Sequence, residues 1–293
     1  MSGGAVDMKE YKTLISAADL LVHLDDPDWL VVDSRFVLTQ PLEGRQKYLA
    51  GHIAGAVFAD LNLDLASAHI PGKTGRHPLP SVEQSAALFS RLGVGTGVQV
   101  VAYDDLGGAL AAVRTWWMLR WLGHERAAVL DGGWQAWQAA RYPTLVGEET
   151  RPARQFIPHT RPEMIATTAD VNQMRLDQSQ LVMDARAAER YRGENETIDP
   201  VAGHVPGAVS APYMGNLNPN GTFRPVEQLR RRYRHLLGEV PPENTATYCG
   251  SGVTSIHNIL AMLHAGLGEG RLYVGSWSEW IADPMRPIAN GEE

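Results

Sequence analysis

The chain has 293 residues, of which 44% are hydrophobic and 20% are charged, a composition and length typical of a globular protein with two domains. Its formal net charge of -7 argues against nucleic acid or a membrane surface as a partner, because both are anionic. Met1 to Lys9 lack the pattern of a secretory signal, and no stretch approaches the roughly 18 apolar residues of a membrane helix. The single cysteine cannot form an intramolecular disulfide, which suits a reducing compartment, so we expect a cytoplasmic protein.

In chain order, the first half of the sequence contains four segments that the second half repeats. The pairs are LVVDSR at 30–35 with LVMDAR at 181–186, GHIAGAV at 51–57 with GHVPGAV at 203–209, VQVVAY at 98–103 with TATY at 245–248, and LDGGW at 130–134 with YVGSW at 273–277. The first two pairs lie 151 and 152 residues apart, so the repeated unit is a whole domain. We predict a first domain at 1–146, a linker at 147–164 and a second domain at 165–293.

Each half alternates short β-branched runs with longer helical patterns. The helix predicted over 255–267 places Ile256, Ile259, Leu260 and Leu263 on one apolar face, and Gly266 follows as a terminator. Strands that alternate with helices indicate a mostly parallel sheet covered on both faces. The predicted fold is therefore α/β, with two tandem domains that each contain such a sheet.

The segment around the only cysteine is the strongest candidate for chemistry. A short strand ends at Tyr248, Cys249 opens a loop of small residues, and a helix begins near Thr254. Gly250 and Gly252 allow the backbone amides to curl around the sulfur, and the helix directs its positive end to the same point. Such a loop stabilises a thiolate or a persulfide, so we expect nucleophilic sulfur chemistry at Cys249.

Two other interpretations of Cys249 have to be weighed. A lone cysteine at a strand end is often a small buried apolar residue, but the glycines and the strand–loop–helix context argue against that here. A phosphatase also places a cysteine at the head of an anion-binding loop, with an arginine six positions later to clamp the phosphoryl oxygens. In this chain that position is Ser255, and the loop contains no basic residue, which argues strongly against a phosphatase.

The motifs Asp184-Ala-Arg186, Gly203-His204, Cys249 to Thr254 and Gly275 to Trp280 resemble those of the tandem-domain rhodanese family over nearly the whole chain. The resemblance implies a catalytic second domain and a non-catalytic first domain, in which Asp104 occupies the position of Cys249. It also implies sulfur transfer from 3-mercaptopyruvate, because thiosulfate-preferring members carry basic residues where this loop has Gly250 and Ser251. Thiosulfate:cyanide sulfurtransferase on the same site remains an alternative.

The resemblance further implies a set of site residues. Arg190 and Arg192 are expected to bind the carboxylate of the donor, and both face one side if their segment is extended. Gly250, Gly252, Val253 and Thr254 are expected to surround the transferred sulfur. A proton relay is expected between Ser251 and His52, with Glu43 as the nearest carboxylate. Because His204 occupies the repeat position of His52, a structural role for both histidines is the alternative.

The expected partners are a small-molecule sulfur donor and an acceptor, which is cyanide, another thiol or a protein such as thioredoxin. We expect no metal and no organic cofactor, since the single cysteine and the histidines form no ligand cluster in the sequence. A non-catalytic module that carries or binds persulfide is the alternative from a different functional class. Such a carrier would load Cys249 but turn over poorly with small donors.

Overall fold

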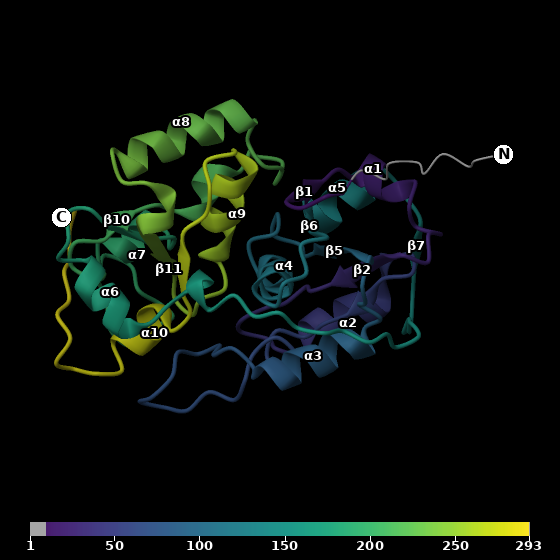
Figure 1. The fold of residues 1–293 in the computed structure, drawn as a ribbon, viewed down its shortest axis with the longest axis horizontal. Coiled ribbons are helices and arrows are strands. Elements are labelled where there is room, and N and C mark those ends of the chain that lie inside the picture. Colours follow the sequence, from purple (N-terminus) through teal and green to yellow (C-terminus); the bar gives the residue numbers. More distant parts are fainter. Residues whose placement is uncertain (1–9, 293) are drawn as a thin grey trace.

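The computed structural model describes residues 10–292, so Met1 to Lys9 lie outside the described part (Figure 1). Two five-stranded sheets, both fully parallel, form the centres of the two halves. The first has the order β1-β6-β5-β2-β4, with β1 at Leu14–Ile15, β2 at Trp29–Asp33, β4 at Val57–Phe58, β5 at Gln99–Tyr103 and β6 at Ala127–Leu130. The second has the order β10-β9-β11-β12-β8, with β8 at Ile165–Ala166, β9 at Leu181–Asp184, β10 at Val209–Ser210, β11 at Thr245–Tyr248 and β12 at Arg271–Tyr273. When the second sheet is read from β8 to β10, its strands follow the same order along the chain as those of the first sheet read from β1 to β4.

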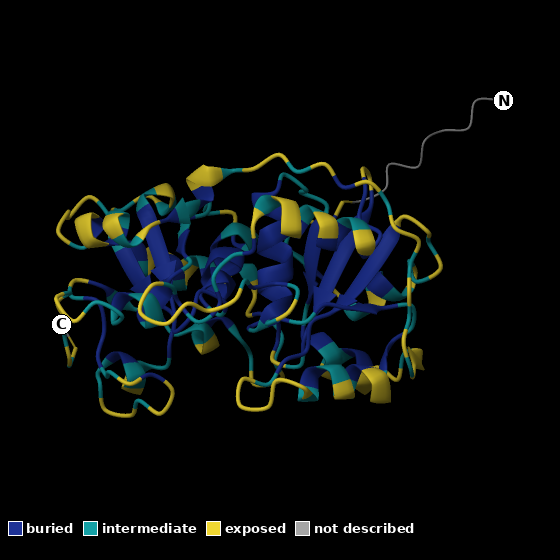
Figure 2. Ribbon diagram, turned by 90° about the horizontal axis from the view of Figure 1, so that it is seen from below, coloured by how far each residue is buried: buried dark blue, intermediate teal, exposed yellow. Residues whose placement is uncertain are grey.

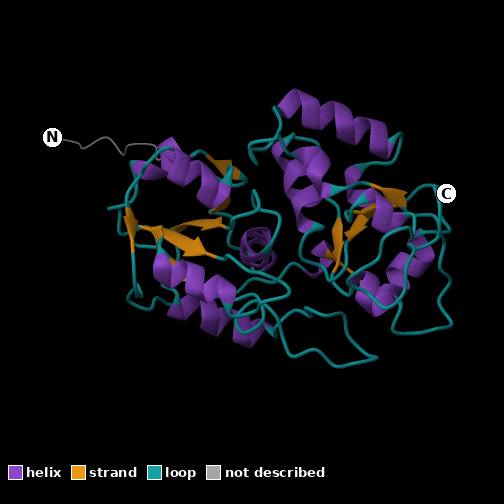
Figure 3. Ribbon diagram, turned by 180° about the vertical axis from the view of Figure 1, so that it is seen from behind, coloured by secondary structure: helices purple, strands orange, loops and turns teal. Residues whose placement is uncertain are grey.

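The helices repeat in the same way. The first half contains α1 at Ala17–Leu21, α2 at Glu43–Ala50, α3 at Val82–Arg91, α4 at Ala111–Trp121 and α5 at Gly133–Ala139. The second contains α6 at Thr168–Met174, α7 at Ala188–Tyr191, α8 at Val226–Leu237, α9 at Ile256–His264 and α10 at Ser276–Trp280. Smaller elements are β3 at His52–Ile53, which pairs with β7 at Thr144–Leu145, and the short 3-10 turns at Pro162–Met164, Tyr213–Asn216 and Pro242–Asn244. The predicted tandem α/β fold with helices on both faces of each sheet is confirmed (Figure 3).

The two halves share one apolar core. Every residue of α4 is buried, because one side of this helix covers its own sheet and another side packs against α9 of the second half (Figure 2). Trp116 and Trp117 of α4 belong to the same buried cluster as Ile259 and Leu260 of α9. A helix covered on all sides is expected to be mostly apolar, and eight of the eleven residues of α4 are apolar, the exceptions being Arg114, Thr115 and Arg120. The interface that holds the two halves together therefore lies directly behind the loop that leads into α9.

The segment before α3 and its counterpart before α8 each cross to the opposite half. Residues 59–81, coloured blue in Figure 1, extend towards α10, and Arg76 N donates to Ser278 Oγ over 3.1 Å. Residues 211–225 reach the first half, where Phe223 N donates to Asp131 Oδ1 over 2.7 Å. Each half thus places an irregular segment over the strand ends of the other.

The proposed linker, 147–164, runs along the first half before the second sheet begins. His159 N donates to Leu122 O and Arg161 N to Trp121 O, each over 2.8 Å, at the end of α4. Within residues 10–292, no helix combines the length and the apolar character needed to cross a membrane.

Candidate active site

Cys249 lies at the carboxyl end of the central strand β11 and is 3% exposed. Its amide donates to Ser276 Oγ over 3.1 Å, and its carbonyl accepts from Trp277 N over 3.0 Å. The next carbonyl, of Gly250, accepts from Ser278 N over 3.0 Å. The start of α10 therefore anchors the backbone on which the sulfur is carried.

The loop after Cys249 turns at Gly252. This residue has a φ of 74°, and a Cβ there would lie 2.2 Å from Val274 O, so only glycine fits. Within the described residues, the amides of Ser251 and Val253 have no hydrogen-bond acceptor. Backbone amides without an acceptor are able to donate to an anion at Cys249.

Ser251 forms a hydrogen bond with a histidine of the first half. Its Oγ lies 2.8 Å from Nδ1 of His77, whose Nε2 lies 3.1 Å from Oδ1 of Asn62. Because the Asn62 oxygen accepts from Nε2–H, Nδ1 carries the lone pair and accepts from the Ser251 hydroxyl. Burial, together with Arg114 and Arg76, lowers the pKa of His77 to about 4, so the ring is neutral at neutral pH.

The structure does not bring His52 to Ser251. His52 is fully buried in the first half, where it stacks on Tyr48 and its Nδ1 lies 2.9 Å from Tyr48 O. His204 has the same arrangement with Tyr191, at 2.7 Å. The two Gly-His motifs therefore support the structure in both halves, and the expected relay partner is replaced by His77.

Glu43, the expected carboxylate of the relay, also lies elsewhere. It belongs to α2 and forms an ion pair with Lys47 over 3.1 Å. Asn62, an amide, occupies the place beside His77 for which a carboxylate was expected. The residue that orients the histidine is therefore neutral.

Arg190 lines the same cavity as Cys249, but acidic residues already hold its side chain. It donates to Glu196 through Nε and Nη2 over 3.0 and 2.9 Å, and Nη2 also donates to Asp199 over 2.9 Å. Asp199 in turn pairs with Arg76, which comes from the first half. A Cβ on Gly250 would lie 2.7 Å from Arg76 Nη2 and 3.8 Å from Arg190 Nη2, so both cations border the loop.

Arg192 does not take part in the site. The expectation assumed an extended segment, whereas α7 makes the segment helical, and residues two apart on a helix face different directions. Arg192 instead forms surface ion pairs with Glu194 at 2.7 Å and with Glu292 at 3.3 Å.

A cavity of about 270 Å³ opens beside the sulfur. Gly250, Ser251, Val253 and Thr254 line it, whereas Gly252 does not and serves the turn instead. The remaining wall comes from both halves and consists of Phe36, Leu38, Leu61, Arg76, His77, Leu110, Ala185, Arg186, Ala187, Arg190, Ile198, Tyr213 and Met214. The site is therefore small, largely apolar and rimmed by arginines.

The equivalent loop of the first half contains Asp104 in place of the cysteine. Its buried carboxylate accepts from the amides of Leu106, Gly108 and Leu110 over 2.8 to 2.9 Å, and from Ala112 over 3.4 Å. Burial raises the pKa of Asp104 to about 6, although the amide bonds oppose this shift. The loop thus encloses an anion that belongs to the chain itself.

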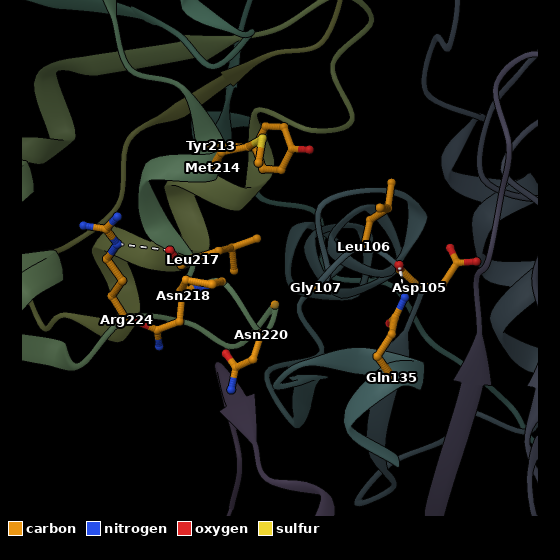
Figure 4. Close-up of a pocket in the computed structure, with 12 residues that line it drawn as sticks. Asp105, Leu106, Gly107, Gln135, Tyr213, Met214, Leu217, Asn218, Asn220 and Arg224 are labelled. Atoms are coloured by element: carbon orange, nitrogen blue, oxygen red, sulfur yellow. Dashed lines mark hydrogen bonds between the residues drawn. The ribbon is translucent and has the colours of Figure 1, made fainter. Parts of the chain in front are cut away.

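A second cavity of about 500 Å³ lies at the mouth of this loop (Figure 4). Asp105, Leu106 and Gly107 form one side, and residues 213–224 of the second half form the other. Tyr213 and Met214 border both cavities. Within residues 10–292, no group of three or more His, Cys, Asp or Glu side chains is arranged to hold a metal ion.

Known proteins share both the sequence and the fold of this chain. The rhodanese-like domain family matches residues 16–140 and again residues 167–283. The chain is 46% identical to a probable 3-mercaptopyruvate sulfurtransferase of Pseudomonas aeruginosa over 281 residues, which is 95% of this chain and 98% of that protein. It is 36% identical to a putative thiosulfate sulfurtransferase of Mycobacterium tuberculosis over 292 residues, 96% of this chain and 98% of that protein.

Solved structures agree with the sequence relatives. The structure of 3-mercaptopyruvate sulfurtransferase from Leishmania major matches with a TM-score of 0.84 and 31% identity, covering 94% of this chain and 75% of that chain. The chain therefore belongs to the rhodanese family, with one rhodanese-like domain in each half.

Proposed function

We propose that this protein is a sulfurtransferase that takes sulfur from 3-mercaptopyruvate onto Cys249 and passes it to a thiol. The observation that carries the proposal is the placement of Cys249 in a loop whose Ser251 bonds a neutral histidine of the other half. The names of the relatives in Pseudomonas aeruginosa and Leishmania major support the choice of donor. The absence of a basic residue between Cys249 and Ser255 also favours a monocarboxylate over the thiosulfate dianion.

In the first half-reaction the Cys249 thiolate attacks the sulfur of the donor. The new S–S bond forms as the C–S bond of 3-mercaptopyruvate breaks, and the electron pair of that bond stays on the carbon. That carbon then takes up the proton from the donor sulfur, which yields pyruvate and a persulfide on Cys249. We propose that the amides of Ser251 and Val253, which have no acceptor among the described residues, stabilise the negative charge on the outer sulfur.

Ser251 and His77 are proposed to move that proton. His77 accepts from the Ser251 hydroxyl through Nδ1, so the serine can take a proton from the donor thiol as it gives its own to the ring. The protonated ring then returns the proton through the serine to the carbon of pyruvate. A histidine that is neutral at neutral pH is the form that this sequence of steps requires.

The carboxylate of the donor is proposed to lie at the arginine rim of the cavity. Arg76 and Arg190 border Gly250, and Asp199 between them keeps both guanidinium groups in place. Because their acidic partners neutralise part of this charge, the rim suits one carboxylate better than a dianion.

In the second half-reaction, the thiolate of an acceptor attacks the outer sulfur of the persulfide and releases the Cys249 thiolate. Cyanide and a thioredoxin-type protein are the other proposed acceptors.

Steady-state rates with 3-mercaptopyruvate and with thiosulfate, for the wild type and Cys249→Ser, test the proposal. We expect kcat/KM to be at least about tenfold higher for 3-mercaptopyruvate, since a dianion gains no extra partner in the loop. The serine variant should lose activity with both donors. A preference for thiosulfate would support the alternative named for the Mycobacterium tuberculosis relative. Efficient loading of Cys249 without turnover would indicate a persulfide carrier instead.

A further inference from the structure

Arg114 of α4 is a buried cation without an acidic partner. Its side chain is fully buried, and among residues 10–292 no carboxylate lies within ion-pair distance of it. It donates only to backbone carbonyls, namely those of Leu65 over 3.3 Å, Gly252 over 3.1 Å and His77 over 3.0 Å. A buried guanidinium without a counterion is rare, because the loss of hydration is not balanced by an opposite charge.

The three carbonyls show what Arg114 faces. Gly252 is the turn of the loop that carries Cys249, and His77 is the partner of Ser251. Burial lowers the pKa of Arg114 to about 10, and Cys249 is the one ionisable side chain among residues 10–292 whose charge opposes this shift. This arginine of the first half therefore lies behind the sulfur site of the second half.

The other charged groups around the cavity are already balanced. Arg76 and Arg190 share Asp199, and Arg186 pairs with Asp184 over 2.6 Å. His77 is neutral at neutral pH, and burial raises the pKa of the Tyr213 phenol. Arg114 is thus the unbalanced cation among these side chains.

The repeat shows that this arginine is not required by the fold of a single half. The loops 104–112 and 249–257 align without gaps, and the same alignment places Ile259 of α9 at the position of Arg114. Ile259 is fully buried and belongs to the shared core. The charge is therefore present only on the helix that backs the cysteine loop.

We infer that Arg114 is a positioning residue for sulfur transfer, and that its guanidinium is the counterion of the thiolate and persulfide on Cys249. The inference rests on the proposed function, because it assigns the missing anionic partner to the sulfur. In this arrangement the non-catalytic half supplies a group that is positively charged at neutral pH as well as His77. Arg114 also fixes the distance between Ser251 and His77, since one guanidinium holds the backbone of both segments.

The pH dependence of Cys249 alkylation by iodoacetamide tests the inference on the intact protein. In Arg114→Gln the midpoint should move up by about 1 to 3 pH units relative to the wild type, as expected for the loss of a neighbouring opposite charge. Arg114→Lys keeps the charge but not the planar fork, so its midpoint should stay near the wild type while kcat falls. An unshifted midpoint in a folded Arg114→Gln protein would overturn the inference, as would equal shifts in both variants.

Arg120→Gln provides the matched control on the same helix. Arg120 is also buried, but it pairs with Glu269 over 2.8 Å, so its loss should leave the alkylation midpoint unchanged. Mass spectrometry of the wild type after treatment with 3-mercaptopyruvate distinguishes a failure of the proposed function from a failure of the role inferred for Arg114. If the wild type fails to gain sulfur, the proposed function fails; if it gains sulfur and Arg114→Gln alkylates like the wild type, only the role of Arg114 fails.

A second measurement covers the case in which Arg114→Gln does not fold. Cys249→Asp gives the second loop the permanent anion that the first loop has in Asp104, and Cys249→Asn is its neutral match. With an unbalanced cation behind the loop, the Asp variant should have the higher Tm at pH 8. A lower Tm for the Asp variant than for the Asn variant would contradict the inference.

Discussion

The loops that begin at Asp104 and at Cys249 have the same frame but differ in the source of the anion. Each follows the central strand of its sheet, each has a positive-φ glycine three residues on, and each leads into a helix buried between the halves. In the first loop, four amides close on the Asp104 carboxylate. In the second, the amides of Ser251 and Val253 have no acceptor among the described residues. The comparison indicates that the chain itself fills the first loop, and it supports our proposal that the second loop binds the transferred sulfur.

The two loops also differ in the ion pair formed by the cation beside each of them. Lys47 and Arg190 are equivalent, because each precedes the tyrosine that stacks on a Gly-His histidine. Lys47 pairs with Asp105 of the first loop over 2.9 Å. At the matching position the second loop has Gly250, and Arg190 pairs instead with Glu196 and Asp199, which lie outside the loop. The cation of the first half is therefore tied to its own loop, whereas that of the second half is not.

The largest predicted effect concerns the dependence of the second loop on the first half. Ser251→Ala and His77→Asn should each lower kcat by about 100-fold or more, because each removes the proton path while leaving the nucleophile in place. Steady-state kinetics with 3-mercaptopyruvate measure this. KM should change less than kcat, since neither residue is a cation that holds the donor.

His52→Asn is the control for this prediction, because His52 is the histidine that the sequence motif suggested. Its ring bonds Tyr48 O, far from the relay, so kcat per folded molecule should stay within about twofold of the wild type. A large loss of kcat in this variant, with normal activity in His77→Asn, would reverse the assignment of the relay.

The next effect tests the filled loop against the open one. Asp104→Ala should lower the free energy of unfolding by about 2 to 4 kcal/mol, because it leaves buried amides without an acceptor. Cys249→Ala should lower it by less, since no amide loses a partner and the Arg114 guanidinium keeps its three carbonyl acceptors. Urea denaturation of both variants measures the difference. Equal losses of unfolding free energy would contradict the view that the chain fills the first loop but not the second.

A smaller effect, on KM, is expected from the loss of the Arg190 guanidinium. Arg190→Met should raise KM for 3-mercaptopyruvate by about tenfold, the size of one lost charge-assisted hydrogen bond. Arg192→Met should leave KM within about twofold, because Arg192 pairs with Glu194 outside the cavity. Similar KM values in both variants would remove Arg190 from the proposed rim.

The smallest effect is a shift in the pH profile. Burial and the nearby arginines lower the pKa of His77 to about 4, and the protonated ring cannot accept from Ser251, so kcat/KM should fall as pH drops through about 4. Asn62→Asp places a carboxylate beside Nε2–H, which favours the protonated ring and should move this limb up by about one pH unit. A limb that stays in place would show that Asn62 does not control the protonation of His77.

The sequence was sufficient to predict the fold and the position of Cys249 at the end of a strand, because both depend on local patterns. The repeated strand ends carry Asp33 with Arg35 and Asp184 with Arg186, and each arginine pairs with its aspartate over 2.6 Å. Both arginines also donate to the carbonyl of the following Gly-His motif, at Gly51 and at Gly203. This is why the motifs recur together in both halves.

His77 and Asn62 could not be predicted in this way. They lie in segment 59–81, whose sequence is not repeated in the second half and has no periodic pattern, and His77 contacts Ser251 across 174 positions of the chain. Their approach depends on how α4 packs against α9, which a strand or helix pattern does not describe. The predicted placement of Arg192 beside Arg190 was wrong for a local reason, because the segment forms the short helix α7 instead of an extended chain.

The most direct test of the account is mass spectrometry of the intact protein after brief incubation with 3-mercaptopyruvate without an acceptor. We predict the mass increase of one sulfur atom on the wild type, located on the peptide that contains Cys249 and removed by a small thiol. Cys249→Ser should show no increase. A wild-type protein that turns over the donor while Cys249 stays unmodified, or a serine variant that gains sulfur, would contradict the account.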